Sequence, residues 1–399
     1  MKKTESNFKS ERNLNKKLLL TAVSTAVISV FVSFIIFYLV FLSDGKYLKL
    51  KQMDILVDRY FFGEVENSSL SDSIMSGYVA GLDDRFASYY DAETTKKRTE
   101  SLEGKSSGIG IMVVKHPDTE NIYIRNVYES SPAQKAGLIA GDQITAVDGV
   151  EVSKAGYTSS INAISGKIGD KRSLTIFRDG KYFDVTVECA ELVAQSVYSS
   201  ILDSQYAYIE ITSFNSETPV QFENAVNQLI SKGAKALIFD LRHNGGGTVD
   251  AVIEMVDYIC PKGTIVTAKY ANGKEKMLGS SDKNEVNLPM VVLTDGETAS
   301  AAELFAASVR DFKKGILIGE KTFGKGVMQT TYMLGDGSST SFTVAEIYPN
   351  SGESYNKVGI IPDIQVKLTD EERKYQLFNI KQNDPVVLSA EKYLKENEK

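Results

Sequence analysis

Two short segments decide how this chain is interpreted: TASAAE at residues 298–303 and KTFGKGVMQ at residues 321–329. The first follows an apolar run and precedes a helical pattern, so we expect Ser300 at a junction between a strand and a helix. The second places Lys325 between two glycines. Because reactive groups of α/β folds lie where strands end and helices begin, Ser300 is a candidate nucleophile. Lys325 is the candidate base that would take its proton.

Lysine acts as a base only when its amine is uncharged. With an ordinary pKa of about 10.4, roughly one lysine in 2,500 is neutral at pH 7. The fold must therefore lower the pKa of Lys325 by about three units, and the expected means is burial among apolar groups, for which Phe323, Val327 and Met328 are available. In an extended strand Gln329 shares a face with Lys325, so we expect its amide to hold the lysine toward Ser300.

Both residues also have a plain structural explanation. Serine is a favoured N-cap of helices, and a lysine between glycines is typical of an exposed turn. Either segment alone favours that explanation over chemistry. The case for a reactive pair therefore depends on the two segments occurring together.

A glycine-rich loop, DLRHNGGG at residues 240–247, is the third candidate element. Consecutive glycines let backbone N–H groups turn toward an incoming oxygen, which suits an oxyanion hole. The N–H of Ala301, at the expected helix start, is a second candidate donor. The phosphate-binding glycine patterns are absent. A serine–histidine mechanism through His243 is disfavoured, because His243 lies within this loop and the chain has no Gly-x-Ser-x-Gly elbow.

Composition limits the possible function classes. The 399 residues suggest two or three domains, and 42% hydrophobic with 24% charged residues is typical of a globular protein. The net charge of −7 and the lack of a basic stripe argue against nucleic-acid binding. No zinc-binding pattern occurs, so we expect neither a metal nor a cofactor. Cys189 and Cys260 could form one disulfide, but nothing in their spacing requires it.

The N-terminus contains an uncharged run, Leu18 to Leu42, that is long enough to cross a bilayer. Mostly basic residues precede it, so residues 1–17 are expected to be a cytoplasmic tail and residues 18–42 a retained anchor. A cleaved signal peptide is the alternative, which the length of the run disfavours. Residues 43–104 have a largely helical pattern, including a charged helix at 91–102.

Residues 105–190 change to short strand-like runs separated by glycine and aspartate turns. The sequences SSPAQKAGL at 130–138, GDQI at 141–144 and GIGI at 108–111 together resemble the PDZ domain signature. The resemblance implies that a peptide's terminal carboxylate is held by the loop at Gly108, Ile109, Gly110 and Ile111. An expected helix at 154–164 would form the other wall of the groove, to which a peptide adds as a strand.

From residue 191 onward strands and helices alternate, which predicts an α/β layer fold with a mixed or largely parallel sheet. The expected strands cover 206–211, 236–240, 265–270, 290–294 and 315–319, with helices at 219–232, 249–259 and 299–310. A strand-rich segment, 328–334 and 340–347, and a helix at 384–395 close the chain.

The order of these motifs resembles the carboxyl-terminal processing peptidases, over roughly Val57 to the C-terminus. The resemblance implies a PDZ domain before a crotonase-like mixed α/β core, residues 191–399, with a C-terminal helix. It also implies a serine endopeptidase with a Ser–Lys dyad assisted by glutamine. The implied roles are nucleophile for Ser300, base for Lys325, orienting residue for Gln329, and oxyanion donors for Gly246 and Ala301. The segment GLDDRFASY at 81–89 resembles the one that precedes the PDZ domain in these enzymes.

Two departures from the family pattern concern this site. The loop reads Asn244-Gly245-Gly246-Gly247 where relatives commonly have Asn-Pro-Gly-Gly, so the oxyanion donor could lie one residue away. Ser165 stands where many relatives carry an arginine that is linked to coupling between PDZ domain and protease.

The sequence thus predicts a bacterial, single-pass membrane protein whose extracytoplasmic part cleaves exported proteins through an acyl-enzyme after recognising their free C-termini. A non-catalytic PDZ scaffold that only binds such C-termini is the alternative. A trypsin-like PDZ protease is disfavoured, because it would need the PDZ domain after the catalytic domain and a His-Asp-Ser triad. Apolar faces at 48–57 and 386–394 permit a homodimer.

Overall fold

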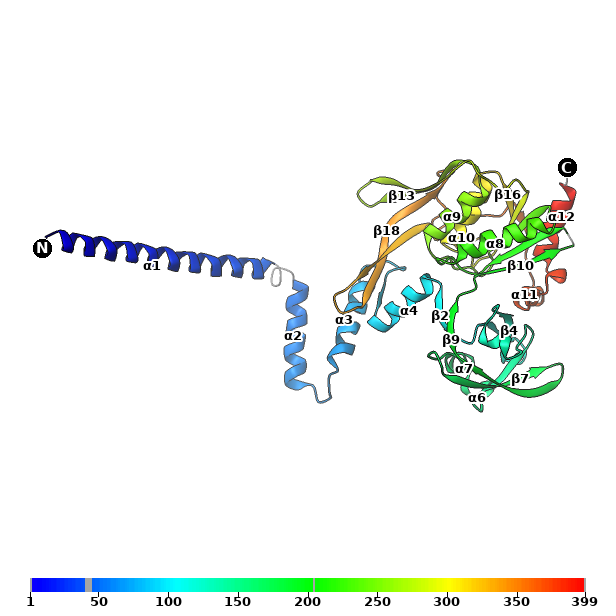
Figure 1. Cartoon of the computed structure of the whole chain (residues 1–399), viewed down its shortest axis with the longest axis horizontal. Helices are drawn as coiled ribbons and strands as arrows, with labels where there is room; N and C mark the ends of the chain where they lie inside the picture. The colour runs from blue at the N-terminus through cyan, green and yellow to red at the C-terminus, as the bar shows by residue number, and fades with distance from the viewer. Residues whose placement is uncertain (1, 40–44, 204, 398–399) are drawn as a thin grey trace. The chain divides into compact units, whose positions relative to one another are not determined.

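The computed structural model describes residues 2–39, 45–203 and 205–397. Its central sheet has six strands in the order β10-β11-β12-β15-β16-β19 (Figure 1). Strand β10 runs antiparallel to β11, and the remaining neighbours are parallel, which confirms the expected mixed sheet. The strand bounds are β10 Val197–Leu202, β11 Tyr206–Ile211, β12 Ala236–Asp240, β15 Met290–Thr294, β16 Gly315–Gly319 and β19 Ile364–Gln365.

Helices cover both faces of this sheet, and its central strands β12 and β15 are accordingly buried along their whole length. Alternate residues of β11 show the division: Ile209 packs in a core with three helices on one face, and Tyr208 packs with the C-terminal helix on the other. The three helices are α8 Thr218–Ser231, α9 Val249–Ile259 and α10 Ala301–Asp311, and the C-terminal helix is α12 Pro385–Glu396. Figure 1 shows α8, α9 and α10 grouped together, and α12, in red, near the C-terminus.

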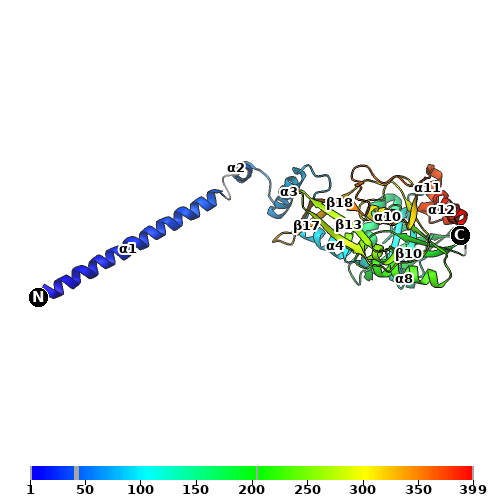
Figure 2. The same ribbon diagram turned by 90° about the horizontal axis from the view of Figure 1, so that it is seen from above.

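A second, antiparallel sheet is built around the long strand β18, Ser339–Pro349 (Figure 2). Strand β17, Val327–Met333, pairs with β18, as does β13, Gly263–Tyr270, which continues to β14, Glu275–Ser281. Strand β1, Ser88–Tyr90, also pairs with β18. We expected only helices in this part of the chain, but a strand of three residues is too short to produce a recognisable sequence pattern.

The region 105–190 folds as a separate sheet with its own core. The strand order is β3-β4-β5-β7-β8, with the short β6 on β5, and β2 pairs with β9 where the region begins and ends. The bounds are β2 Lys105–Gly108, β3 Ile111–Lys115, β4 Ile122–Val127, β5 Gln143–Val147, β6 Val150–Glu151, β7 Lys171–Arg178, β8 Lys181–Glu188 and β9 Ala190–Val193. The expected helix 154–164 is interrupted at Gly156, where φ is 83°. It is therefore split into α6, Val152–Ala155, and α7, Tyr157–Ile164.

The remaining elements are short or terminal. Helix α5, Pro132–Lys135, lies in the 105–190 region. The expected helix at 91–102 is α4, Ala92–Leu102, and Asp91 is its N-cap. Helix α11, Asp370–Leu377, and a 3₁₀ turn at Lys381–Asn383 were not expected from the sequence. Cys189 and Cys260 are buried in different cores as free thiols, so the disulfide left open by the sequence is not formed.

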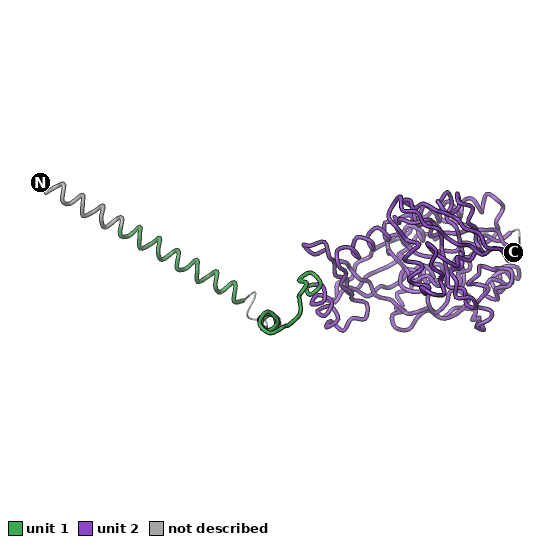
Figure 3. Tube along the Cα trace, turned by 90° about the horizontal axis from the view of Figure 1, so that it is seen from below, with its two compact units in different colours: residues 1–71 green, residues 72–399 purple. Residues whose placement is uncertain are grey.

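The chain divides into two compact units, residues 1–71 and 72–399 (Figure 3). The first unit contains α1, Lys2–Phe37, and α2, Gly45–Tyr60, and helix α3, Asn67–Ala80, crosses the boundary. Lys16–Phe37 is long and apolar enough to cross a membrane, with a mean hydropathy of 2.4 and none of it buried. A signal sequence has the same character. Residues 40–42 of the expected anchor lie outside the described residues.

Candidate active site

Ser300 lies between the end of β15 and the start of α10, at the expected junction. Its backbone φ of 59° and ψ of −118° are unusual for a residue with a side chain, and such conformations persist only where the surroundings hold them. One restraint is the N–H of Ala299, which donates to the carbonyl of Asn244 at 3.0 Å. The turn that presents Ser300 is therefore fastened to the glycine-rich loop.

Glu303 is the second restraint on Ser300, and it is completely buried. One carboxylate oxygen accepts from the N–H of Ser300 at 2.9 Å and from the N–H of Lys325 at 2.8 Å. The other accepts from the hydroxyl of Thr322 at 2.5 Å and the N–H of Gly324 at 2.7 Å. A single side chain thus joins the backbones of the two predicted reactive residues. The sequence reasoning gave Glu303 no role, although it is part of the segment 298–303.

Lys325 is half-buried, and its Nζ lies 4.7 Å from the ring centroid of Phe86. Burial is the main cause that lowers the pKa of Lys325, and the positive charges of Arg98 and Arg85 lower it further, whereas Asp84 and Glu303 oppose the shift. The direction is the one a lysine base requires. The aromatic cover comes from Phe86, and Phe323 of the expected pocket is 49% exposed.

Gln329 does not share a regular strand with Lys325. Strand β17 begins at Val327, after Lys325, and its register shifts between Met328 and Gln329. The amide nitrogen of Gln329 donates to the hydroxyl of Thr343 at 3.2 Å and to the carbonyl of Val327 at 3.5 Å. Within the described residues no hydrogen bond joins the side chains of Lys325 and Gln329, or those of Lys325 and Ser300.

The glycine-rich loop packs directly against Ser300. A Cβ atom at Gly246, where φ is 102°, would lie 2.9 Å from Cβ of Ser300 and 3.0 Å from N of Ala301, so a side chain does not fit there. The two predicted oxyanion donors are therefore neighbours. The N–H of Gly246 donates to Oδ1 of Asn244 at 2.8 Å, and the Asn244 amide donates to the carbonyl of Ile211 at 2.7 Å. In this structure the Gly246 donor is thus engaged within its own loop.

The loop also contains the histidine that the competing mechanism needs. His243 has half of its side chain exposed, and its Nδ1 lies 2.9 Å from Glu297 and 3.2 Å from Asp295. Glu297 is exposed, Asp295 is buried, and within the described residues no hydrogen bond joins the His243 ring to Ser300. Arg242, by contrast, is buried between Asp240 at 2.6 Å and Asp384 at 2.8 Å, so it anchors the loop to the start of α12.

The predicted carboxylate-binding loop of the 105–190 region lines a pocket of about 150 Å³. Residues 108–111 form one side, and Ile161 and Ile164 of α7 form another. Strand β3, which starts at Ile111, is an edge strand of its sheet, paired with β4 only. An edge strand beside a helix is the geometry to which an extended peptide can be added.

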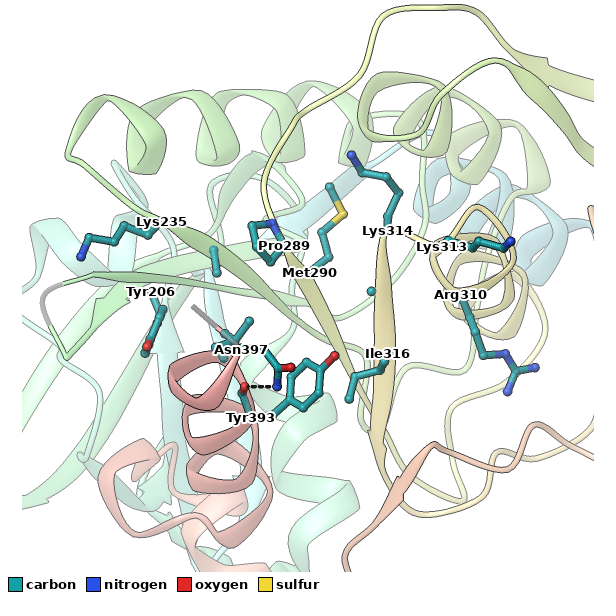
Figure 4. A pocket seen from close by; sticks show the side chains of 13 residues that line it. Tyr206, Lys235, Pro289, Met290, Arg310, Lys313, Lys314, Ile316, Tyr393 and Asn397 are labelled. Atoms are coloured by element: carbon teal, nitrogen blue, oxygen red, sulfur yellow. Dashed lines mark hydrogen bonds between the residues drawn. The ribbon is translucent and has the colours of Figure 1, made fainter. Parts of the chain in front are cut away.

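A second pocket, of larger volume at about 800 Å³, lies at the opposite ends of the central strands (Figure 4). Its lining includes Ala236, Met290 and Gly315, the first residues of β12, β15 and β16. Ser300 follows the other end of β15. Cationic side chains surround the pocket, but Figure 4 shows Lys235 and Lys313 pointing away from each other. We therefore place the candidate chemistry at Ser300 and not in this pocket. No acidic, histidine or cysteine cluster suited to a metal occurs among the described residues.

Comparisons with known proteins agree with the order of these parts. The model of peptidase family S41 matches residues 205–366, and the PDZ domain model matches residues 107–189. The chain is 34% identical over 329 residues to carboxy-terminal processing protease CtpA of Bacillus subtilis, covering 82% of this chain and 70% of that protein. It is 30% identical over 315 residues to the carboxyl-terminal-processing protease of Synechocystis, covering 77% and 74%. A solved S41-protease homologue from Bacteroides fragilis shares the fold with a TM-score of 0.60 at 18% identity, covering 87% of this chain and 97% of that one.

Proposed function

Because this chain belongs to the carboxyl-terminal processing proteases of peptidase family S41, we propose that it is a membrane-anchored endopeptidase that cleaves exported proteins after recognising their C-terminal tails. The family supports the serine-type peptidase activity itself. The anchor, the reactive residues and the use of the PDZ domain are our inferences from the residues and contacts described above.

The observation that carries the mechanism is the Glu303 carboxylate, one oxygen of which accepts from the backbone N–H groups of both Ser300 and Lys325. We infer that Oγ of Ser300 attacks the scissile carbonyl carbon while the neutral amine of Lys325 takes the hydroxyl proton. The tetrahedral intermediate then expels the amine of the leaving peptide, which receives that proton from Lys325. Water attacks the resulting acyl-enzyme, with Lys325 again serving as base, and releases the new C-terminus.

The negative oxygen of the tetrahedral intermediate needs donors, for which Ala301 and Gly246 are the candidates. The N–H of Ala301 belongs to the first turn of α10, where free amides and the helix dipole favour negative charge. For Gly246 to contribute, its N–H must give up its hydrogen bond to Oδ1 of Asn244 and donate to the substrate oxygen instead. Gln329 would act by orienting Lys325, for which it must leave Thr343.

The PDZ domain supplies substrate selection in this proposal. A substrate tail would add to the edge strand β3, and its terminal carboxylate would meet the backbone N–H groups of residues 108–111. Recognition of a free carboxylate accounts for selection of C-terminal tails and does not require a particular sequence at the cleavage site.

The test uses the full-length protein in detergent with an unfolded protein substrate. We expect cleavage by the unmodified enzyme, none by Ser300→Ala, and covalent labelling of Ser300 by a serine-directed fluorophosphonate. A substrate whose C-terminus is amidated should be cleaved more slowly than the free acid. Binding of the free C-terminus without cleavage by the unmodified protein would instead favour the scaffold function.

The membrane anchor has its own test, because an apolar N-terminal helix also fits a signal sequence. In bacterial cells we expect the whole chain to remain in the membrane fraction after alkaline extraction, with the catalytic part degraded by protease added to spheroplasts. Release of a soluble, shortened protein would show that residues 16–37 are removed as a signal sequence.

A further inference from the structure

We propose that the segment Asp84–Phe86, which precedes the PDZ domain, is a positioning element of the catalytic centre: Phe86 covers the Lys325 amine, and Asp84 locks this cover onto strand β18. This inference rests on the proposed role of Lys325 as the base. It assigns part of the centre to a segment far away in the sequence from both reactive residues.

The cover is a direct contact. Phe86 is half-buried, and its ring centroid lies 4.7 Å from Nζ of Lys325. The guanidinium of Arg85 lies 4.4 Å from the same ring and 5.2 Å from the ring of Phe323, so it bridges the two aromatic side chains. The Phe86 ring is thus in contact with both Arg85 and Lys325. The Lys325 amine has no hydrogen-bond partner among the described residues.

Asp84 fixes this segment to the sheet that contains Gln329. One oxygen of its carboxylate accepts from the N–H of Thr343 on β18 at 2.8 Å, and the other accepts from the N–H of Phe86 at 3.0 Å. The hydroxyl of the same Thr343 accepts from the Gln329 amide at 3.2 Å. Two residues after Phe86, strand β1 pairs with β18 as well. The segment is therefore attached to β18 before and after the aromatic cover.

The charges facing Lys325 come from three elements and partly oppose one another. Arg98 of α4 and Arg85 disfavour the ammonium form, whereas Asp84 and Glu303 of α10 favour it. An aromatic face also attracts a cation, which would favour the charged amine. Burial is nevertheless the largest cause of the lowered pKa of Lys325, so exclusion of water is the main effect of the surroundings to which Phe86 belongs.

The experiment compares Phe86→Ala with Phe86→Leu in the full-length enzyme by measuring kcat/KM from pH 6 to pH 10.5. Loss of the cover hydrates the amine, so the alanine variant should have its rising limb displaced to higher pH and recover activity at the alkaline end. Activity at pH 7 falls about tenfold for each pH unit of displacement. Leucine keeps the apolar cover, and its profile should stay close to that of the unmodified enzyme.

Phe183→Ala is the matched control. Phe183 also has an arginine over its ring, Arg178 at 5.0 Å, but it lies on β8 of the PDZ domain. Its replacement should leave the pH profile in place. Denaturant midpoints of all variants separate lost folding from a changed profile.

Asp84→Asn in the Phe86→Ala background provides a second, opposite prediction, because no aromatic cover is left there to loosen. The amide oxygen can still accept from the N–H of Thr343, although the acceptor for the N–H of residue 86 is lost. A negative charge that favours the ammonium form is gone, so the rising limb should move to lower pH than in Phe86→Ala alone. If Phe86→Ala lowers activity equally at every pH, or leaves the profile unchanged while Lys325→Ala is inactive, the cover proposal is wrong and the proposed function stands. If Lys325→Ala still cleaves, the proposed mechanism itself fails.

Discussion

Two half-buried lysines have much in common: Lys325, whose backbone is joined to that of Ser300 through Glu303, and Lys381, whose amine lies over Tyr208 of β11. Burial lowers the pKa of both, and each amine lies over an aromatic ring, that of Phe86 at 4.7 Å and that of Tyr208 at 4.3 Å. A depressed lysine pKa is often used to locate active sites. Here it identifies two places, only one of which contains the motifs of a serine peptidase.

The two lysines differ in the charged groups that face them and in the groups to which they are bonded. Lys381 faces Glu210 and Asp240, two buried carboxylates on the central sheet, and its amine donates to the hydroxyl of Ser200 at 3.2 Å. Lys325 faces two arginines, Arg98 and Arg85, as well as the carboxylates of Asp84 and Glu303. Its backbone is joined to that of Ser300 through Glu303. The difference teaches that the lysine proposed as the base is distinguished by what its backbone is bonded to, and not by its burial.

The largest expected effect is on catalysis. Lys325→Arg keeps the positive charge but cannot provide a neutral base, because a guanidinium does not deprotonate in this range. Loss of a general base typically costs about 10²–10⁴-fold, so we expect kcat to fall by that factor. Lys381→Met should keep kcat within about threefold, since Lys381 takes no part in the proposed chemistry. An active Lys325→Arg enzyme would remove the distinction between the two lysines.

The region around Lys381 is expected to matter for stability instead. Arg125 of the PDZ domain forms a buried ion pair with Glu210 of the core, and the second Glu210 oxygen has no hydrogen-bond partner among the described atoms. Arg125→Met leaves that carboxylate unpaired, so the free energy of unfolding should fall by about 3–5 kcal/mol.

The matched control is Lys115→Met, which removes an exposed ion pair with Glu120 in the same domain and should cost less than about 1 kcal/mol. Urea unfolding measures both variants. Replacing Arg125 and Glu210 together by apolar residues should recover most of the lost stability, because no buried charge is then left unpaired. Equal losses in the two single variants would show that the buried pair has no special weight.

The region around Lys325 is expected to matter for stability as well, through Glu303. Glu303→Ala leaves the backbone donors of Ser300, Gly324 and Lys325 without their acceptor, so we expect a loss of roughly 3 kcal/mol in unfolding free energy together with a large loss of activity. Glu297→Ala is the control, since this carboxylate is exposed in the same turn. Thermal unfolding and peptide cleavage provide the two measurements, and unchanged values for both would contradict the assigned role.

The smallest expected effect is on the pH dependence of stability. The pKa of Lys381 is lowered in the folded state from 10.5, so the unfolded chain binds more protons between the lowered value and 10.5. Stability contributed by this group therefore rises with pH through that window. Lys381→Met should remove this contribution, and the difference in unfolding free energy between variant and unmodified protein should change with pH accordingly. A difference that stays constant with pH would mean that Lys381 titrates alike in both states.

Much of the architecture could be predicted because it is recorded in local patterns. Strands β11, β12, β15 and β16 and helix α9 have the expected bounds, since each is a continuous or periodic apolar segment. The motifs around Ser300 and Lys325 were recognised by residue type and spacing. Strands β9, β10 and β14 were not expected, because their sequences are polar or irregular and they owe their existence to partner strands.

By itself the sequence determined the peptidase family, the PDZ domain ahead of the core, the apolar N-terminal helix and the segments that contain Ser300, Lys325 and Gly246. Only the tertiary structure decided what surrounds the lysine: Phe86 and Asp84 arrive from before the PDZ domain, because β1 pairs with β18. It also decided that Gln329 bonds Thr343, since a register shift interrupts the strand expected to align it with Lys325. The physical reason is that spacing along a chain records helices, strands and turns, whereas contacts between distant segments follow from strand pairing that no local pattern contains.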